Sequence, residues 1–237
     1  MHHNHMTLTL SALATLAAGC ESNPVEPEML ISKTADLALC SSAAGGFSTT
    51  STNPWFPLQV GYVWNYEGEE DGELVELRIA VLDQTEVVGG VTTRVVEERE
   101  WVDGDLIEVS LNYFAQASDG SVCYFGEAVD IFDPETGELV SHEGAWRADE
   151  GENAPGIIMP GDPVPGLKFV MEVAPGIAED EGVVVGSGPI KIGDVTYPET
   201  IRIREFNPLD GDKGFKVYAR DIGLVVDGPV ELVSVNF

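Results

Sequence analysis

Carboxylates are the most abundant groups in this sequence that could do chemistry. Glu127 follows the aromatic run "CYF", Glu143 stands near Trp146, and Glu172 lies in the apolar stretch "LKFVMEV". An apolar setting raises the pKa of a carboxyl and allows it to act as a general acid. Two carboxyls held roughly 5 to 10 Å apart across a cleft would suit glycoside hydrolysis. Spacing along the chain does not fix that separation, so a carboxylate-pair hydrolase is one hypothesis among three.

Histidine-dependent chemistry is not favoured. The sequence has 4 histidines, and three of them lie in residues 1–5, which leaves His142 as the base for any Ser-His or Cys-His pair. The G-x-S-x-G motif of many serine hydrolases is missing, and one histidine with distant cysteines does not make the usual zinc ligand set. The sequence therefore favours a protein without enzymatic activity.

Acidic loops could instead hold a hard cation such as Ca²⁺, which prefers oxygen ligands. The stretches "DGDLIE" and "LDGDKG" each place two acids around a glycine, and "AEDE" is a denser cluster. The candidate ligands are Asp103, Asp105, Asp210, Asp212, Glu179 and Asp180. Neither loop has the acid and glycine spacing of an EF-hand, and hairpin turns explain both more simply. A Ca²⁺-dependent structural or adhesion protein is the second hypothesis, and no other cofactor is expected.

The segment "GAWRADEGENAPGIIMPGDP", residues 144–163, is longer than an ordinary connection between strands. Trp146 offers a flat apolar face, Arg147 offers a fork for an anion, and the apolar triplet 157–159 should pack against the domain. The segment could plug one end of the domain or form the rim of a pocket. The residues expected near a ligand are Trp146, Arg147, Tyr124, Phe125, Glu127, His142 and Glu143.

Alternating polar and apolar residues predict the elements that position these groups. In "LIEVSLNYF", residues 106–114, Ile107, Val109 and Leu111 alternate with polar neighbours, which is the period of a half-buried strand. The stretches "VELRIAV" and "TIRIREF" alternate in the same way, and turn residues such as "GG", "SDG" and "PETG" separate such runs. We expect an all-β fold, an antiparallel β barrel or sandwich of roughly ten to twelve strands. Nothing predicts a βαβ unit, which excludes Rossmann and P-loop nucleotide folds.

The N-terminal residues have the character of a targeting segment. "MTLTLSALATLAAGC" is a short apolar run that ends in small residues before Cys20, and it resembles the lipobox of bacterial lipoproteins. The alternative is an ordinary signal peptide. We expect a signal peptide over 1–19, a flexible tether over 20–52 and one β-domain over 53–237. A lipid on Cys20 would anchor the protein to the bacterial cell envelope; without it the protein would be periplasmic or extracellular.

Charge and cysteine usage narrow the partners. Lys+Arg number 12 against 41 Asp+Glu, a formal net charge of −29, so nucleic acid is excluded as a partner because it is bound through Lys and Arg. So acidic a surface is soluble, and we expect a monomer. Cys40 and Cys123 could form a disulfide in an oxidising compartment, or Cys123 could be buried and unpaired. The sequence leaves both open.

The two ends of the expected domain resemble a broad group of uncharacterised bacterial exported proteins and lipoproteins. Its opening strand has the pattern FPLxxGxxWxY and its closing hairpin the pattern YAxGxGLV. The matching positions are Phe56, Pro57, Leu58, Gly61, Trp64 and Tyr66, then Tyr218, Ala219, Ile222, Gly223, Leu224 and Val225, with Asp221 where that group more often has glycine. The resemblance implies an antiparallel β-domain and no activity. The first hypothesis is therefore a non-enzymatic envelope module that binds a small molecule or an envelope component at the open face of its sheet.

Overall fold

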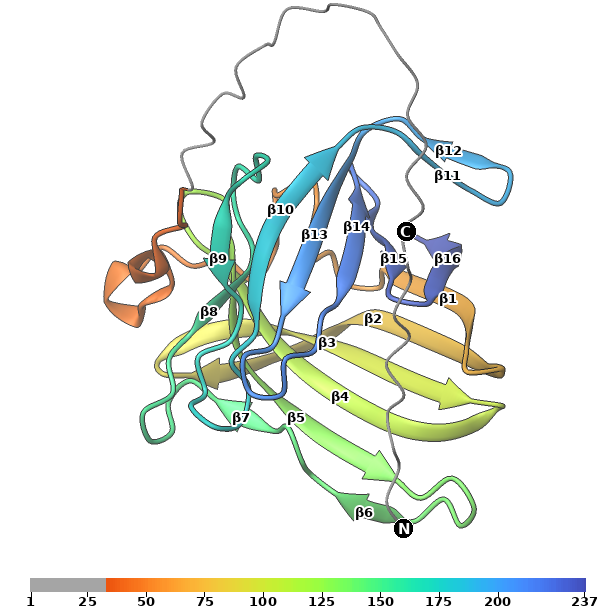
Figure 1. Cartoon of the computed structure of the whole chain (residues 1–237). Helices are drawn as coiled ribbons and strands as arrows, with labels where there is room; N and C mark the ends of the chain where they lie inside the picture. The colour runs from red at the N-terminus through yellow and green to blue at the C-terminus, as the bar shows by residue number, and fades with distance from the viewer. Residues whose placement is uncertain (1–32) are drawn as a thin grey trace, which may run out of the picture. The chain divides into compact units, whose positions relative to one another are not determined.

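The computed structural model describes residues 33–237, which form an all-β unit (Figure 1). One half of the main sheet contains β1 (Val63–Glu70), β2 (Glu73–Val88), β3 (Val91–Val102), β4 (Asp105–Gln116), β5 (Val122–Phe132) and β6 (Leu139–Ser141). The other half contains β9 (Lys168–Val170), β10 (Glu181–Ser187), β13 (Thr200–Phe206), β14 (Phe215–Ala219), β15 (Gly223–Asp227) and β16 (Val230–Asn236). The short strands β7 (Trp146–Arg147) and β8 (Gly156–Met159) pair with β5, while β11 (Ile190–Ile192) and β12 (Val195–Tyr197) form a separate hairpin.

The main sheet has 14 antiparallel strands in the order β6-β5-β4-β3-β2-β1-β16-β15-β14-β13-β10-β9, with β7 and β8 off this path. Because the path starts at β6 and ends at β9, the sheet does not close into a barrel, and the predicted sandwich is the alternative confirmed. The strand count exceeds the expected ten to twelve because several strands are only two to four residues long. The helical elements of the described part are two 3-10 turns, η1 (Leu37–Cys40) and η2 (Ser42–Ala44).

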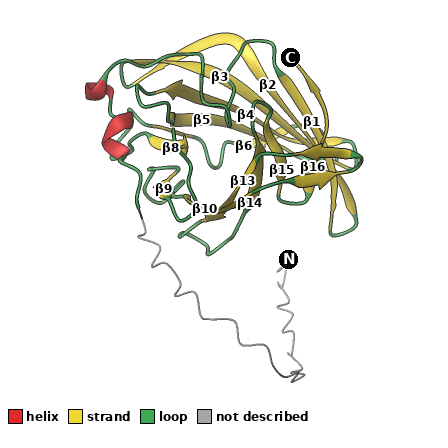
Figure 2. Ribbon diagram, turned by 90° about the horizontal axis from the view of Figure 1, so that it is seen from above, coloured by secondary structure: helices red, strands yellow, loops and turns green. Residues whose placement is uncertain are grey.

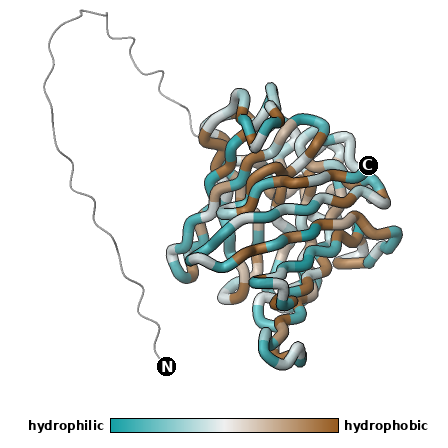
Figure 3. Tube along the Cα trace, turned by 90° about the vertical axis from the view of Figure 1, so that its right-hand side faces the viewer, coloured by the Kyte–Doolittle hydropathy of each residue, from teal (hydrophilic) through white to brown (hydrophobic). Residues whose placement is uncertain are grey.

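The two halves of the sheet lie across each other. The long strands β2–β5 form one layer, and β10, β13 and β14 form a second layer that crosses it, with the β1–β16 pair joining the two (Figures 1 and 2). Hydrophilic and hydrophobic residues alternate along the strands, as a sheet with two different faces requires (Figure 3). Side chains that are almost completely buried include Tyr66, Phe125, Phe169, Leu58, Ile203 and Val217.

The segment expected as a flexible tether is ordered where the structure describes it, from residue 33 to 52. A disulfide joins Cys40 to Cys123 on β5, and both residues are 0 % exposed. Ser48 pairs with Gln116 through two backbone hydrogen bonds, and the buried guanidinium of Arg94 donates to the Thr49 carbonyl. These long-range contacts, which a Ser/Thr-rich composition does not reveal, correct the predicted tether in this part. The expected signal peptide and Cys20 lie outside the described residues.

The long segment 144–163 is also ordered. It contributes β7 and β8 to the edge of β5, and Ala154 forms a bridge with Val173 just after β9. A side chain at Gly156 would collide with the Met171 carbonyl, so only glycine permits this close approach. Ile157 and Met159 are 1 % and 0 % exposed. The predicted packing of the apolar triplet is therefore present, and the segment ties β5 to the far edge of the sheet.

Candidate functional site

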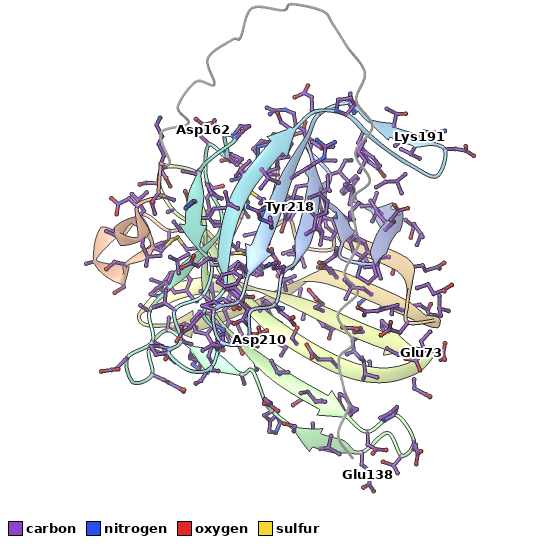
Figure 4. The ribbon with its side chains drawn as sticks, viewed as in Figure 1. Glu73, Glu138, Asp162, Lys191, Asp210 and Tyr218 are labelled. Atoms are coloured by element: carbon purple, nitrogen blue, oxygen red, sulfur yellow. A yellow bond between two sulfur atoms is a disulfide. The ribbon has the colours of Figure 1, made fainter. Side chains whose placement is uncertain are left out.

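A cavity of about 230 Å³ lies between the two halves of the sheet. One part of its lining is aromatic: Trp55, Phe56, Trp64, Tyr66, Phe114, Tyr124 and Tyr218. The other part is acidic: Glu98, Glu108, Glu127, Glu172, Asp180, Glu205 and Asp227. Lys216 is the one basic residue in this lining. Figure 4 shows Tyr218 on β14 in the middle of the described part, and Asp210 outside this region at the turn between β13 and β14.

The first half of the sheet turns polar side chains into this cavity. Glu98 on β3 lies opposite Ser110 on β4, and Asn112 lies opposite Glu127 on β5. Ser110 and Asn112 are 4 % and 8 % exposed, whereas Val109 on the other face of β4 is only half-buried. The polar residues of this predicted strand therefore face the interior. That orientation is the reverse of an ordinary half-buried strand.

A β-bulge brings Tyr124 and Glu127 to the same side of β5. Residues three apart on a regular strand point to opposite faces. Asn112 on β4 pairs with Glu127, and Phe114 pairs with Tyr124. A step of two residues along β4 therefore corresponds to a step of three along β5. Gly126, with φ of 128°, accommodates the extra residue, and a side chain there would collide with the Trp146 carbonyl of β7. Glycine at this position is thus needed for the site's geometry.

The second half of the sheet also contains a β-bulge beside the cavity. A register shift between β14 and β15 lets Leu224 and Asp227, also three residues apart, both line the cavity. Lys216 lies directly opposite Asp227, and its Nζ is 3.6 Å from Asp227 Oδ1 and 3.2 Å from Glu205 Oε2. Burial opposes the charged form of Lys216, but the Asp227 and Glu205 charges raise its pKa well above the ordinary value. The ammonium is therefore fixed between two carboxylates.

Burial raises the pKa of three glutamates in the cavity. The pKa of Glu127 rises to about 8, through burial first and then the charge of Glu172. The pKa of Glu98 rises to about 7, through burial and then the charge of Asp227, and that of Glu172 to about 7, through burial and then the charge of Asp180. These carboxyls carry protons for part of the time near neutral pH.

Aromatic rings in and behind one wall of the cavity form a continuous series of edge-to-face and tilted contacts. Ring centroids of Phe56 and Phe114 are 5.1 Å apart, those of Phe114 and Tyr124 are 4.8 Å apart, and those of Tyr124 and Trp146 are 5.3 Å apart. The Tyr124 hydroxyl donates to Asn112 Oδ1, and the Tyr66 hydroxyl donates to the Leu224 carbonyl at 3.0 Å. These hydroxyls are satisfied by the protein itself. Aromatic ring atoms, rather than free hydroxyls, therefore make up this part of the lining.

Two buried polar atoms of residues that line the cavity have no hydrogen-bond partner among the described residues: Asp180 Oδ1 and Glu205 Oε1. Glu205 is only 8 % exposed. Unsatisfied buried polar atoms are costly, and most in folded proteins contact water or a ligand.

Two of the predicted ligand-contacting residues line the cavity, namely Tyr124 and Glu127. Phe125 points to the opposite face of β5, where its ring packs edge-on against Phe47. Trp146 supports Tyr124 from behind. Ile158, between the buried Ile157 and Met159, lines the cavity and is the contribution of segment 144–163 to its wall.

The remaining predicted ligand contacts lie outside the cavity lining. Arg147 is 3.1 Å from Glu86 and 3.2 Å from Asp149, and it lies over the Tyr113 ring. His142 has a side chain that is 63 % exposed, its Nδ1 lies 2.7 Å from the Val129 carbonyl oxygen and 2.9 Å from Asp130 Oδ1, and Glu143 is exposed. Acidic partners on the surface hold the Arg147 guanidinium there. The Arg147 guanidinium, which was expected to bind an anion, therefore does not line this cavity.

The acidic loops considered for Ca²⁺ act mainly as turns. Asp103 accepts a hydrogen bond from the Leu74 N–H, Asp210 from the Asp212 N–H, and Glu179 from the Gly176 N–H. Asp105 and Asp212 are exposed at these turns, and Asp180 lines the cavity. Within residues 33–237, no group of three or more His, Cys, Asp or Glu side chains is placed to hold a metal ion.

Sequence reasoning missed Glu98, Glu205, Lys216 and Asp227. A signal for some of them is present, because a charged residue occupies an inward position in an alternating strand. In "TIRIREF", Glu205 shares the face of Ile201 and Ile203, and Lys216 stands between apolar residues in "FKVYA". Asp227 had no such signal, since the bulge in β15 breaks the alternation.

Comparison with known protein families, with curated proteins and with solved structures finds no match. In the described part of the chain, no helix has the length and apolar character needed to cross a membrane. The cavity is therefore the feature of this protein from which a function can be inferred.

Proposed function

We propose that this protein is a non-enzymatic binding module whose ligand occupies the cavity between the two halves of the sheet. The observation that carries the proposal is the inward orientation of polar side chains on β3, β4 and β5 around a space of about 230 Å³. A sheet that only needed to be stable would pack apolar side chains there, because buried polar groups cost free energy unless they are paired. An aromatic lining with a few convergent polar groups is typical of small-molecule sites.

The size of the cavity limits the ligand. A volume of about 230 Å³ lies below the range of roughly 300 to 1,000 Å³ that is common for drug-sized ligands. The ligand of this module is accordingly a small metabolite or one terminal group of an envelope component.

A panel of small molecules tests this proposal through thermal unfolding. Amines, sugars, carboxylic acids and neutral alcohols are added separately to wild type and to Ser110→Phe, which fills the cavity from β4. At least one class should raise the melting temperature of wild type by several degrees and leave the variant unchanged, since a ligand stabilises only the state that binds it. Ser110→Leu is a smaller second filling variant in case the phenylalanine prevents folding. A shift of equal size in wild type and a folded filled variant would contradict binding in the cavity.

A carboxylate-pair hydrolase remains the second candidate. Its specific support is the pair Glu127 and Glu172, since both line the cavity and burial and mutual charge raise the pKa of Glu127 to about 8. Release of nitrophenol from nitrophenyl glycosides by wild type, abolished in Glu127→Gln, would favour this candidate over the binding module.

We also propose that the module is exported and anchored to the cell envelope through a lipid on Cys20. Support comes from the Cys40–Cys123 disulfide, because structural disulfides persist mainly in oxidising compartments. When the full chain is expressed in a bacterium with radioactive palmitate, the protein should incorporate the label and fractionate with membranes. Cys20→Ala should remove the label and leave the disulfide intact. Labelling that persists in Cys20→Ala, or a wild type without label, would contradict the anchor.

A further inference from the structure

The charges that line the cavity do not balance. Seven carboxyl residues face one lysine, and that lysine is already held by Glu205 and Asp227. Within residues 33–237, Glu98, Glu127 and Glu172 form no ion pair; the Lys216 charge lowers the pKa of Glu98 and Glu172, but burial outweighs it. A buried carboxylate is normally paired with a cation or satisfied by hydrogen bonds, because its transfer out of water is expensive.

The Lys216 side chain shows how this cavity holds an ammonium group. On the wall made by β13, β14 and β15, the Lys216 Nζ lies 3.2 Å from Glu205 and 3.6 Å from Asp227. The wall made by β3, β4 and β5 has Glu98 and Glu127 but no basic residue in the lining. The wall made by β3, β4 and β5 therefore has carboxyls like those around Lys216, but no ammonium group between them.

The aromatic wall next to these carboxyls suits the same kind of group. Phe114 and Tyr124 both line the cavity, with ring centroids 4.8 Å apart, and Asn112 lies between Glu127 and Ser110 on the same face. The face of an aromatic ring attracts a cation, and the attraction is strongest where water is excluded. Carboxylates combined with ring faces favour an organic ammonium over a bare metal ion, which needs several oxygen ligands converging on one point.

The unpartnered buried atoms point to a missing ligand independently of the charges. Glu205 Oε1 belongs to a residue that is 8 % exposed and lines the cavity, and it accepts no hydrogen bond. Asp180 Oδ1, in another residue that lines the cavity, also has no hydrogen-bond partner among the described residues. Each atom could be satisfied by a ligand or by water that a ligand orders.

We infer that the ligand of this cavity is a small organic ammonium compound, bound by the Glu98, Glu127 and Glu172 carboxylates and by the faces of Phe114 and Tyr124. This inference rests on the proposed binding function and names the chemical class of its ligand. The cavity volume of about 230 Å³ limits the compound to an amine with a short body.

Binding of the ammonium releases protons. Burial raises the pKa of Glu98 and Glu172 to about 7 and that of Glu127 to about 8, so these carboxyls are partly protonated before the cation arrives. The other titratable groups facing them from the surrounding elements are Glu108, Asp180, Glu205, Asp227, Lys216, Tyr66, Tyr124 and Tyr218. A cation favours the ionised form of each nearby carboxyl, so affinity should increase as pH rises from 6 to 8.

Calorimetric titration with matched probes tests the inference. Choline and n-butylammonium are compared with their neutral counterparts, 3,3-dimethylbutan-1-ol and 1-butanol, on the wild-type protein. At least one ammonium should bind with a Kd below about 1 mM, and its neutral counterpart about tenfold or more weaker. The affinity should rise with pH, by up to about tenfold per unit where one proton is released. Glu127→Gln should weaken binding about tenfold, while Glu135→Gln, at an exposed turn, should not change it.

The outcomes separate this inference from the proposed function. Equal binding of ammonium and neutral probes, both lost in Ser110→Phe, would overturn the ammonium class and keep the binding module. If only sugars or carboxylic acids raise the melting temperature of wild type, the ammonium class is likewise overturned and the binding module is kept. If no probe binds and no panel class gives a cavity-dependent shift, both the inference and the proposed function are wrong.

Discussion

Replacing Cys40 and Cys123 together by serine should lower the free energy of unfolding by about 4 kcal/mol. The disulfide links residues separated by 83 positions, and a cross-link over so long a loop removes much entropy from the unfolded chain. Both cysteines are 0 % exposed, so the serine hydroxyls would also be buried in an apolar setting. Urea denaturation of the double variant and of wild type measures the difference.

The same change should release the segment around residues 41–52. Without the cross-link, this segment is held mainly by the Ser48–Gln116 pairing and by Arg94, and limited proteolysis should cut it first. Ser42→Ala, an exposed change in the same segment, is the control and should unfold as wild type does. A loss of less than about 1 kcal/mol in the double variant would show that the disulfide contributes little to the fold.

Raising the pH from 5 to 8 should lower the free energy of unfolding by several kcal/mol, because each of three cavity carboxyls contributes about 2 to 3 kcal/mol over this range. The pKa of Glu98 and Glu172 is raised from 4.5 to about 7 in the folded protein, and that of Glu127 from 4.5 to about 8. Below pH 4.5 these carboxyls are protonated in both states. As pH rises, the unfolded chain ionises first, so stability falls until the folded pKa values are passed. Urea denaturation across this pH range, without ligand, measures the slope.

Substituting these three carboxyls isolates their part of the pH dependence. The triple variant Glu98→Gln, Glu127→Gln and Glu172→Gln should lose most of the slope and be more stable than wild type at pH 8. A matched triple variant at the exposed residues Glu69, Glu135 and Glu150 should keep the wild-type slope. An unchanged slope in the first variant would mean that the cavity carboxyls do not titrate as their burial implies.

The strands could be predicted from the sequence because alternation survives along most of their length. The prediction did not say which face of β4 turns inward. In "LIEVSLNYF", Ser110 and Asn112 would be expected outside by polarity alone, yet they are 4 % and 8 % exposed in the interior. A period of two identifies two faces, and only the packing of the other layer decides which one is buried.

The residues that line the cavity were only partly predictable, because two β-bulges shift the alternation of side chains between the two faces of the sheet. Tyr124 and Glu127 could be named from composition, but their shared face depends on the bulge at Gly126. Lys216 and Asp227 meet across β14 and β15 only in the shifted register of that pair. Such contacts depend on pairing between strands, which composition and spacing do not encode directly.

The disulfide and the ordered N-terminal segment were underestimated for a related reason. Residues 40–53 are rich in Ser, Thr and Gly, a composition that is typical of flexible linkers. Their order comes from distant partners, namely Cys123, Gln116 and Arg94. The cavity between the two halves likewise arises from the crossing of distant strands.

A crystal structure determined in the presence of the tightest-binding amine from the titrations shows whether the cavity binds an ammonium compound. Electron density for the amine should lie inside the cavity, with its nitrogen near Glu127 and its body against Phe114 and Tyr124. A cavity that contains only ordered water, in crystals where the same amine binds elsewhere or not at all, would contradict this prediction.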